Sequence, residues 1–314
     1  SNVDYHDLIF QTALSSDNNI SLTGNVNDAL PYRASLGYTT QEGTLIGSTY
    51  DRATLDLSVA PSLLDKHLTL NLNGKGLYSY SNYSDGGVVG NAAFFNPTQD
   101  PYFRNADGSI DYTTCNGFWN YGGGRGDQFT QSTLVGVSPL SQLYDKVSNG
   151  RAYRFIGNAN IDYKVHGLEE LKFVLSLGMD YSWGRNYNGV NPGSFQAAGD
   201  NENPRIGQYS ISNSVSRNEV LEAYANYNKD FGIHNLDVMA GYSWQHVYNG
   251  GQSISYFNET DEVKLNPGES IDTRYPYGAS ESYLVSFYSR VNYSLDSRYL
   301  FTASIRADGS SKFS

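Results

Sequence analysis

Residues 283–313 read YLVSFYSRVNYSLDSRYLFTASIRADGSSKF, and the alternation within this stretch decides the fold. From Tyr283 to Tyr293 every second residue is mainly aromatic or aliphatic, whereas the interleaved residues are mainly polar and include Arg290. The run after LDSR repeats the pattern and places Arg306 among its polar positions. A period of two is typical of a strand with one apolar and one polar face. The stretch therefore predicts a β-hairpin that turns at LDSR.

The same alternation recurs along the chain and predicts an all-β protein. Several of the predicted strands exceed the length of about 5–6 residues that is usual in globular sheets. They suit a tilted strand that crosses a membrane, which needs about 9–11 residues in the hydrocarbon. The ten predicted strands cover residues 18–24, 31–41, 49–60, 67–81, 150–164, 171–187, 215–229, 235–249, 282–294 and 299–307.

The connections between these strands alternate in length. After the first hairpin, short turns alternate with longer connections, of which 82–149, 188–214 and 250–281 are the longest. Bacterial outer-membrane barrels have this pattern, with short periplasmic turns and long extracellular loops. Tyrosine and tryptophan also gather in two groups, beside the short turns and beside the long connections, as at the two interfaces of a membrane. We therefore expect an antiparallel meander that forms part of a large transmembrane β-barrel.

Composition agrees with a barrel and excludes several other classes. The 314 residues include 27 Tyr and 32 Gly, and 17% are charged, against about 25% in ordinary soluble domains. The net charge of −11 argues against a nucleic-acid partner. The single Cys115 allows no intrachain disulfide, and the histidines lack metal-ligand spacing, so neither a metal nor another cofactor is predicted. No catalytic motif is found, and we do not expect an enzyme.

The polar faces of the predicted strands carry charged side chains. A charge on a lipid-facing surface near the bilayer midplane costs about 2–4 kcal/mol, so charges are expected on the opposite face. That face would meet a water-filled or protein-filled interior, where an arginine can be hydrated or paired. The residues predicted to face this interior are Arg154, Asp162, Asp180, Arg290 and Arg306.

The longest connection contains the best candidates for binding a ligand. Sugar rings stack on aromatic faces and form hydrogen bonds with amides, so the sequence FWNY and its neighbours could hold a glycan. The alternative is that these residues pack the loop against its surroundings. NADGSID at 105–111 is oxygen-rich, but its glycine is misplaced for a calcium loop, which favours an ordinary turn. The predicted substrate-binding residues are Asn116, Phe118, Trp119, Asn120 and Tyr121.

Both ends of the chain carry motifs that resemble the SusC-like (SusC/RagA) branch of TonB-dependent outer-membrane transporters. At one end these are Arg290-Val291-Asn292-Tyr293, Arg298-Tyr299-Leu300 and the run from Thr302 to Phe313. At the other end, VDYHDLIFQTALSSDNNISLTG at 3–24 precedes YRASLGYTTQEGTLIGSTYDRATLDLS at 32–58. Tyr5 stands where the family motif has a tryptophan.

This resemblance implies a function as well as a fold. Members of the family form a barrel of about 22 strands filled by a plug. They import bulky nutrients, most often oligosaccharides, with energy from the TonB complex and with a SusD-like surface lipoprotein as partner. Residues 1–314 would then be one partial barrel domain, embedded in outer-membrane lipid and lacking the plug and the remaining strands. The alternative from another class is a secreted or surface β-rich carbohydrate-binding or adhesion module.

Overall fold

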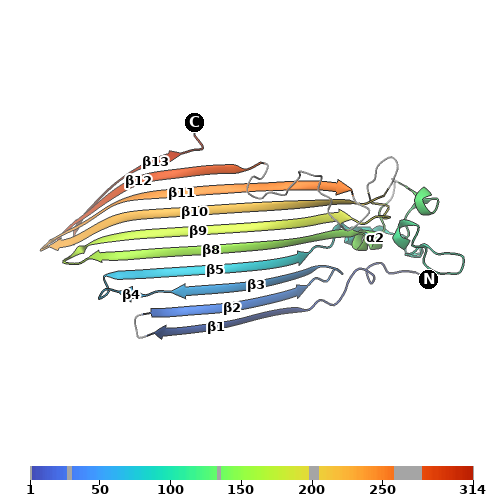
Figure 1. Ribbon diagram of the computed structural model, residues 1–314, viewed down its shortest axis with the longest axis horizontal. Coiled ribbons are helices and arrows are strands. Elements are labelled where there is room, and N and C mark those ends of the chain that lie inside the picture. Colours follow the sequence, from blue (N-terminus) through green and yellow to red (C-terminus); the bar gives the residue numbers. More distant parts are fainter. Residues whose placement is uncertain (1, 27–29, 133–135, 198–204, 258–277, 314) are drawn as a thin grey trace, which may run out of the picture.

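The computed structural model describes residues 2–26, 30–132, 136–197, 205–257 and 278–313. Within these ranges ten long strands form one antiparallel sheet, in which each long strand pairs with the next along the chain (Figure 1). The predicted all-β meander is thereby confirmed. The strands are β1 (Ser15–Val26), β2 (Leu30–Glu42), β3 (Thr49–Val59), β5 (Leu68–Asn82), β8 (Lys146–Val165), β9 (Leu168–Val190), β10 (Gln208–Phe231), β11 (His234–Phe257), β12 (Ser280–Leu295) and β13 (Tyr299–Ser310).

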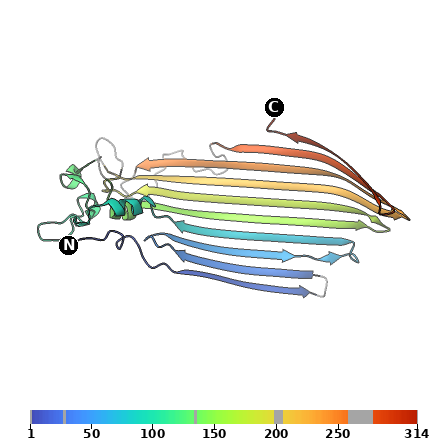
Figure 2. The same ribbon diagram turned by 180° about the vertical axis from the view of Figure 1, so that it is seen from behind.

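The sheet is long, curved and open, with β1 at one edge and β13 at the other (Figure 1). Tight turns join β8 to β9, β10 to β11 and β12 to β13 at one end of the sheet (Figure 1). The helices lie at the opposite end together with the N-terminus, and the view from behind shows the same arrangement (Figure 2). Short turns and long connections therefore lie at opposite ends, as the sequence predicts.

The hairpin at the end of the chain turns where the sequence predicts it. Leu295 pairs with Tyr299, and the backbone N–H of Arg298 donates to the carbonyl of Leu295 at 3.0 Å. Asp296 and Ser297 adopt φ values of 49° and 52°. This left-handed conformation is unfavourable for most side chains, but short polar residues such as aspartate tolerate it. The sequence LDSR thus supplies the turn that sets the register of β12 against β13.

Several strands are longer than predicted, and the largest extensions run toward the long connections. β8 begins at Lys146 rather than at 150, β10 begins at Gln208 rather than at 215, and β11 ends at Phe257 rather than at 249. The added segments are rich in serine, asparagine and glycine and contain few apolar residues. Backbone pairing continues through them nevertheless, as between Ser210 and Ser255. Tyr209 and Ile211 at the start of β10 alternate with serines and are buried, but so short an alternation gives only a weak periodic signal.

The two faces of the sheet differ sharply in chemistry. One face, called the apolar face, carries large side chains that stay exposed, such as Phe155 (46% exposed), Phe173 (48%) and Leu177 (39%). The other, called the polar face, carries the charged residues, such as Arg154 and Asp180. An apolar surface of this extent requires a non-aqueous neighbour. No helix in the described ranges is both long and apolar enough to cross a membrane.

The connection between β5 and β8 folds into structure of its own. Ser138 caps α2 by accepting a hydrogen bond from the backbone N–H of Ser141, and Pro139 occupies the first turn, where its missing N–H costs nothing. Together with residues 2–11, the described part of 83–145 forms what we call the cap. Its elements are α1 (Gly87–Phe94), α2 (Pro139–Tyr144), the 3-10 turns η1 (Cys115–Gly117) and η2 (Gly126–Gln128), and the short strands β6 (Gly122–Gly123) and β7 (Thr130–Gln131). A further short strand, β4 (Ser62–Leu63), pairs with β5 outside the cap.

Candidate functional site

The cap has a small hydrophobic core that joins the N-terminal segment to the connection between β5 and β8. Tyr5 packs edge-on against Phe95, with ring centroids 5.0 Å apart, and its hydroxyl donates to the carbonyl of Gln99 at 3.0 Å. Burial raises the pKa of Tyr5 to about 12. Tyr5 and Ile9, both from the DYHDLIF motif, therefore anchor the start of the chain to the cap. The buried residues of this core are Tyr5, Ile9, Val88, Ala92, Phe95 and Leu140.

The predicted aromatic residues take part in the packing of the cap. Trp119 meets Phe95 at 5.7 Å and Tyr121 at 4.8 Å, in both cases edge to face. Phe118 instead stacks on Tyr144, with a centroid distance of 5.9 Å and an interplanar angle of 9°. Phe118, Trp119 and Tyr121 all stay half-buried, so part of each ring remains accessible.

The predicted amides connect separate segments. Asn120 is 1% exposed, and its Oδ1 accepts a hydrogen bond from the Ser138 backbone N–H at 2.8 Å, at the start of α2. The Nδ2 of Asn116 donates to Asp145 Oδ1 and to the Pro192 carbonyl, both at 2.9 Å. Asn116 therefore ties the cap to the connection between β9 and β10. The structure brings all five predicted residues into one region, and their direct contact with a ligand stays a prediction.

Exposed aromatic side chains elsewhere in the cap escaped the sequence analysis. Phe94 at the end of α1 is 92% exposed, Tyr112 is 69% exposed and Tyr144 is 48% exposed. Large apolar side chains exposed on a protein surface are typical contacts for a ligand or a partner. No motif distinguishes them in the sequence, because their exposure depends on how the cap folds.

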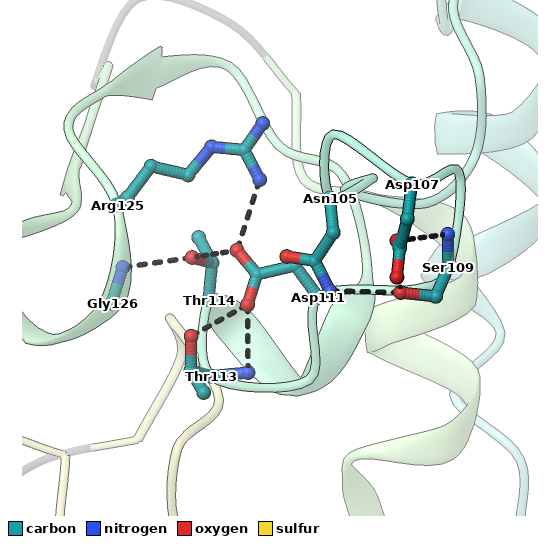
Figure 3. Close-up of polar contacts among 8 residues, drawn as sticks. All are labelled: Asn105, Asp107, Ser109, Asp111, Thr113, Thr114, Arg125 and Gly126. Carbon is teal, nitrogen blue, oxygen red and sulfur yellow. Dashed lines mark hydrogen bonds and ion pairs between the residues drawn. The ribbon is translucent and has the colours of Figure 1, made fainter.

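Asp111 is the centre of a polar network that holds the second half of the cap together (Figure 3). Its carboxylate accepts hydrogen bonds from the Thr113 hydroxyl at 2.5 Å, the Thr114 hydroxyl at 2.8 Å and the Arg125 guanidinium at 2.9 Å. These bonds, led by that from Thr113, hold the pKa of Asp111 well below its usual range. Arg125 also lies over the ring of Phe103 at 5.1 Å. The glycine-rich GGGRGD stretch at 122–127 is therefore part of an ordered hairpin between β6 and β7.

The oxygen-rich NADGSID stretch forms a turn that uses its own oxygens (Figure 3). Asp107 Oδ1 accepts from both the backbone N–H of Ser109 (3.0 Å) and its hydroxyl (2.7 Å), and Asn105 donates to the same hydroxyl at 3.0 Å. In the described part of the chain, no group of three or more His, Cys, Asp or Glu side chains is arranged to hold a metal ion. The ordinary turn that the sequence favours is what the structure shows.

Within the cap, Cys115 and Asp145 are buried polar groups. Burial raises the pKa of the Cys115 thiol to about 11, although Arg205 lies 3.8 Å from its sulfur. Burial also raises the pKa of Asp145, while hydrogen bonds from Ser141 (2.5 Å) and Asn116 favour its charged form. Both side chains support the packing of neighbouring segments.

The polar face of the sheet brings its charged residues into pairs. Arg154 donates to both carboxylate oxygens of Asp180, at 2.9 and 2.6 Å. Lys172 lies 3.1 Å from Asp162 on the neighbouring strand. Arg154, Asp162 and Asp180 of the predicted set therefore each meet an opposite charge on the neighbouring strand, as paired charges on a sheet do.

The remaining two predicted arginines of the polar face differ from each other. Arg306 donates to Asp308 at 2.8 Å and to Ser286 at 3.0 Å. Arg290 is exposed and has no ion-pair partner among the residues that the structure describes. Near β2 and β5 the polar face is also hollowed by a groove of about 470 Å³, lined by Arg33, Ser35, Asp56, Asn73, Lys75 and Asn158 among others.

Comparison with known proteins shows which family this chain belongs to. No protein-family model matches the chain. The chain is 34% identical over 325 aligned residues to the TonB-dependent receptor SusC of Bacteroides thetaiotaomicron, an alignment that covers 100% of this chain and 31% of SusC. The chain belongs to the SusC-like TonB-dependent receptors. This SusC-like segment is also 27% identical over 335 residues to TonB-dependent receptor P3 of Formosa agariphila, covering 100% of the segment and 30% of that receptor.

Solved structures show the same fold for the SusC-like segment. The RagAB peptide transporter matches with a TM-score of 0.68 at 18% identity, over 100% of the segment and 34% of that chain. The ferric citrate transporter FecA matches with a TM-score of 0.51 at 11% identity, over 96% of the segment and 35% of that chain. The segment is thus part of an outer-membrane β-barrel, which decides against the secreted or surface module. It spans less than a third of the length of the curated relatives SusC and P3, and these named relatives are receptors rather than enzymes.

Proposed function

We propose that the receptor to which this segment belongs imports an oligosaccharide across the outer membrane. The observation that carries the proposal is the 34% identity to SusC over the whole segment. The sheet supports it, since its apolar face suits lipid and its polar face suits a filled interior. Import of a bulky solute through such a barrel needs energy, which the TonB complex would supply. A SusD-like surface lipoprotein would bind the same cargo from outside.

In this proposal the polar face lines the lumen and contacts the plug. The paired charges of Arg154 with Asp180 and of Lys172 with Asp162 would present a neutral, hydrated wall. Arg290, which lacks an ionic partner in the described residues, would pair with a carboxylate of the plug. Charged groups that meet across such an interface fix its register more than they add affinity.

The cap would contact the cargo and its lipoprotein partner from the extracellular side. The accessible parts of Phe118, Trp119 and Tyr121 can stack against sugar rings. Asn116 and Asn120 hold these rings in place through their bonds to Asp145 and Ser138. The strongly exposed Phe94, Tyr112 and Tyr144 provide the apolar surface for the partner.

A peptide is the cargo to be distinguished from an oligosaccharide, since RagAB is a peptide importer. At 18% identity that likeness concerns the fold alone. The test expresses the complete receptor with its neighbouring lipoprotein in a strain lacking its own importers. Uptake of fluorescent oligosaccharides of defined linkage and of peptides of similar mass is then measured. We expect oligosaccharide uptake that ceases when TonB is deleted; uptake of peptides alone would contradict the proposed cargo.

A further inference from the structure

The apolar face has a defined height between its two belts of aromatic residues. On β8 the band runs from Tyr163 beside the turn to Tyr153 toward the long connection, ten residue steps away. At about 3.3 Å per residue and a tilt of about 40°, these steps span roughly 25 Å of membrane depth. The apolar band of outer-membrane barrels is also about 25 Å tall. Residues of the apolar face beyond Tyr153 therefore lie level with the lipid headgroups.

Two arginines lie side by side at this level. Arg151 and Arg185 lie two residues beyond the belt residues Tyr153 and Trp183, on the side away from the tight turn. They are direct cross-strand partners on β8 and β9. Both side chains are exposed. Like charges placed directly opposite each other destabilise a sheet, and neither guanidinium can lose its proton near neutral pH. A pair of this kind calls for an anion between the two side chains.

Within the described residues, that anion is not supplied by the protein. Arg151 lies over the ring of Tyr80, with its guanidinium carbon 5.8 Å from the ring centroid, and this contact leaves its N–H donors in the ring plane free. Across the described ranges, no carboxylate lies within ion-pair distance of Arg151 or Arg185.

On β10–β12 the apolar face also carries polar and charged side chains, but these contact one another. There Arg217 lies 3.8 Å from Glu219, and the imidazole of His246 lies 2.8 Å from Glu219 and 2.7 Å from Glu281. Arg217 and these carboxylates therefore have polar partners within the protein. On β8 and β9, farther from the tight turns, two positive charges face each other, so any compensation must come from outside the described residues.

We propose that Arg151 and Arg185 bind the phosphate of a phosphorylated glycolipid of the outer leaflet. The planar guanidinium matches phosphate oxygens in a bidentate manner, and two of them can share one phosphate. Tyr153 lies between Tyr78 (4.9 Å) and Trp183 (5.4 Å), which forms an aromatic shelf directly below the arginines. Such rings suit the boundary between a headgroup sugar and its acyl chains.

A groove farther down the apolar face suits the acyl chains of the same lipid. It has a volume of about 510 Å³, and its lining is mainly apolar, with Phe155, Gly157, Ala159, Leu177, Met179 and Trp244, but also includes Glu219. The hollow exists because Gly157 and Ala159 bring almost no side-chain volume between larger neighbours. A Cβ at Gly157 would lie 2.9 Å from the Phe155 ring, so a side chain there would intrude into the groove. Positive charge above and a mainly apolar hollow below point to a lipid rather than to a free anion.

The test measures lipid binding to the complete receptor purified in detergent, by native mass spectrometry. Bisphosphorylated lipid A and dephosphorylated lipid A are the two probes. We expect the wild-type receptor to prefer the phosphorylated form by about tenfold or more. The double variant Arg151→Gln/Arg185→Gln should lose this preference, and Arg151→Lys/Arg185→Lys should keep part of it because charge remains without the planar fork.

The matched control is Arg154→Gln, on the same strand but on the polar face, which should bind lipid A as the wild type does. Heat-modifiable migration in gels checks that each variant barrel is folded. Equal binding of both probes by the wild type, or unchanged binding by the folded glutamine double variant, would overturn the proposal. Displacement of the lipid by millimolar inorganic phosphate would also overturn it, since it would reveal a site for a free anion.

Discussion

The sheet and the cap keep their folds by different means. In the sheet, backbone pairing runs along almost the full length of β8–β11. A single side chain there mainly has to suit the surroundings of its face, lipid on one side and polar groups on the other. In the cap, a few buried side chains join segments far apart in the sequence, such as Tyr5 with Phe95. The sheet should therefore tolerate most substitutions that preserve its two faces. The cap should respond to the loss of individual contacts.

The largest effect is expected from reversing the polarity of the apolar face. Leu175→Arg places a charge on that face of β9 and should cost about 2–4 kcal/mol of barrel stability. Ser176→Arg, one residue farther on, points to the polar face and should be tolerated. The folded fraction in the outer membrane, measured by heat-modifiable migration, distinguishes the two. Equal tolerance of both variants would contradict the assignment of the faces.

A smaller and more local effect is expected in the hydrophobic core of the cap. Val88→Ala removes two methyl groups from a fully buried side chain of α1 and should destabilise the cap by about 1–2 kcal/mol. Val89→Ala changes the neighbouring residue, which is 37% exposed, and should have little effect. Limited proteolysis of intact cells should show faster cleavage in the cap of Val88→Ala alone, while the barrel stays folded. Loss of the folded barrel would mean that cap and sheet are not separable.

The polar network at Asp111 should make the cap sensitive to acid. Because the pKa of Asp111 is lower in the folded cap than in an unfolded chain, its contribution to stability is present above about pH 4. That contribution is lost as the pH falls toward the lowered folded pKa. Asp111→Asn should weaken the cap by about 1 kcal/mol at neutral pH and flatten this acid dependence. Cleavage by an acid-active protease across pH 2–6 measures both effects; an unchanged pH profile would exclude Asp111 as the group responsible.

The smallest effect is expected from the ion pairs of the polar face. Arg154 and Asp180 form a bidentate pair, but both side chains are well exposed, at 50% and 35%. Arg154→Gln should therefore change barrel stability by less than about 1 kcal/mol. Thermal unfolding of the purified receptor, followed by circular dichroism, gives the measurement. A larger loss would show that the pair is shielded from water by another part of the receptor.

The difference between sheet and cap also explains how much of each could be predicted from the sequence. The alternation from Tyr153 to Tyr163 reveals a strand because lipid lies on one side and polar groups on the other. The segments from Gln208 to Ser214 and from Gly250 to Phe257 carry only short alternation, so β10 was predicted to start too late and β11 to end too early. Pairing there depends on the neighbouring strand, and the sequence of one segment alone does not show which strand lies beside it.

The cap was harder to predict because its contacts are distant in the sequence. The predicted residues Asn116, Phe118, Trp119, Asn120 and Tyr121 do gather in one region, yet their partners Phe95, Ser138 and Pro192 could not be inferred from local patterns. The polar partners of Arg154 and Asp162 were closer to prediction, because register places them on facing strands. Arg290 has no ion-pair partner among the described residues.

The extension of β10 and its neighbours past the membrane has a consequence for where cargo is met. From Val215, which pairs with the belt residue Trp183, to Gln208, β10 continues for seven residue steps. At about 3.3 Å per residue and a tilt of about 40°, this adds roughly 18 Å of height. The wall thus continues well beyond the bilayer. Under the proposed import function, a nutrient would meet the end of this wall before it reaches the level of the membrane.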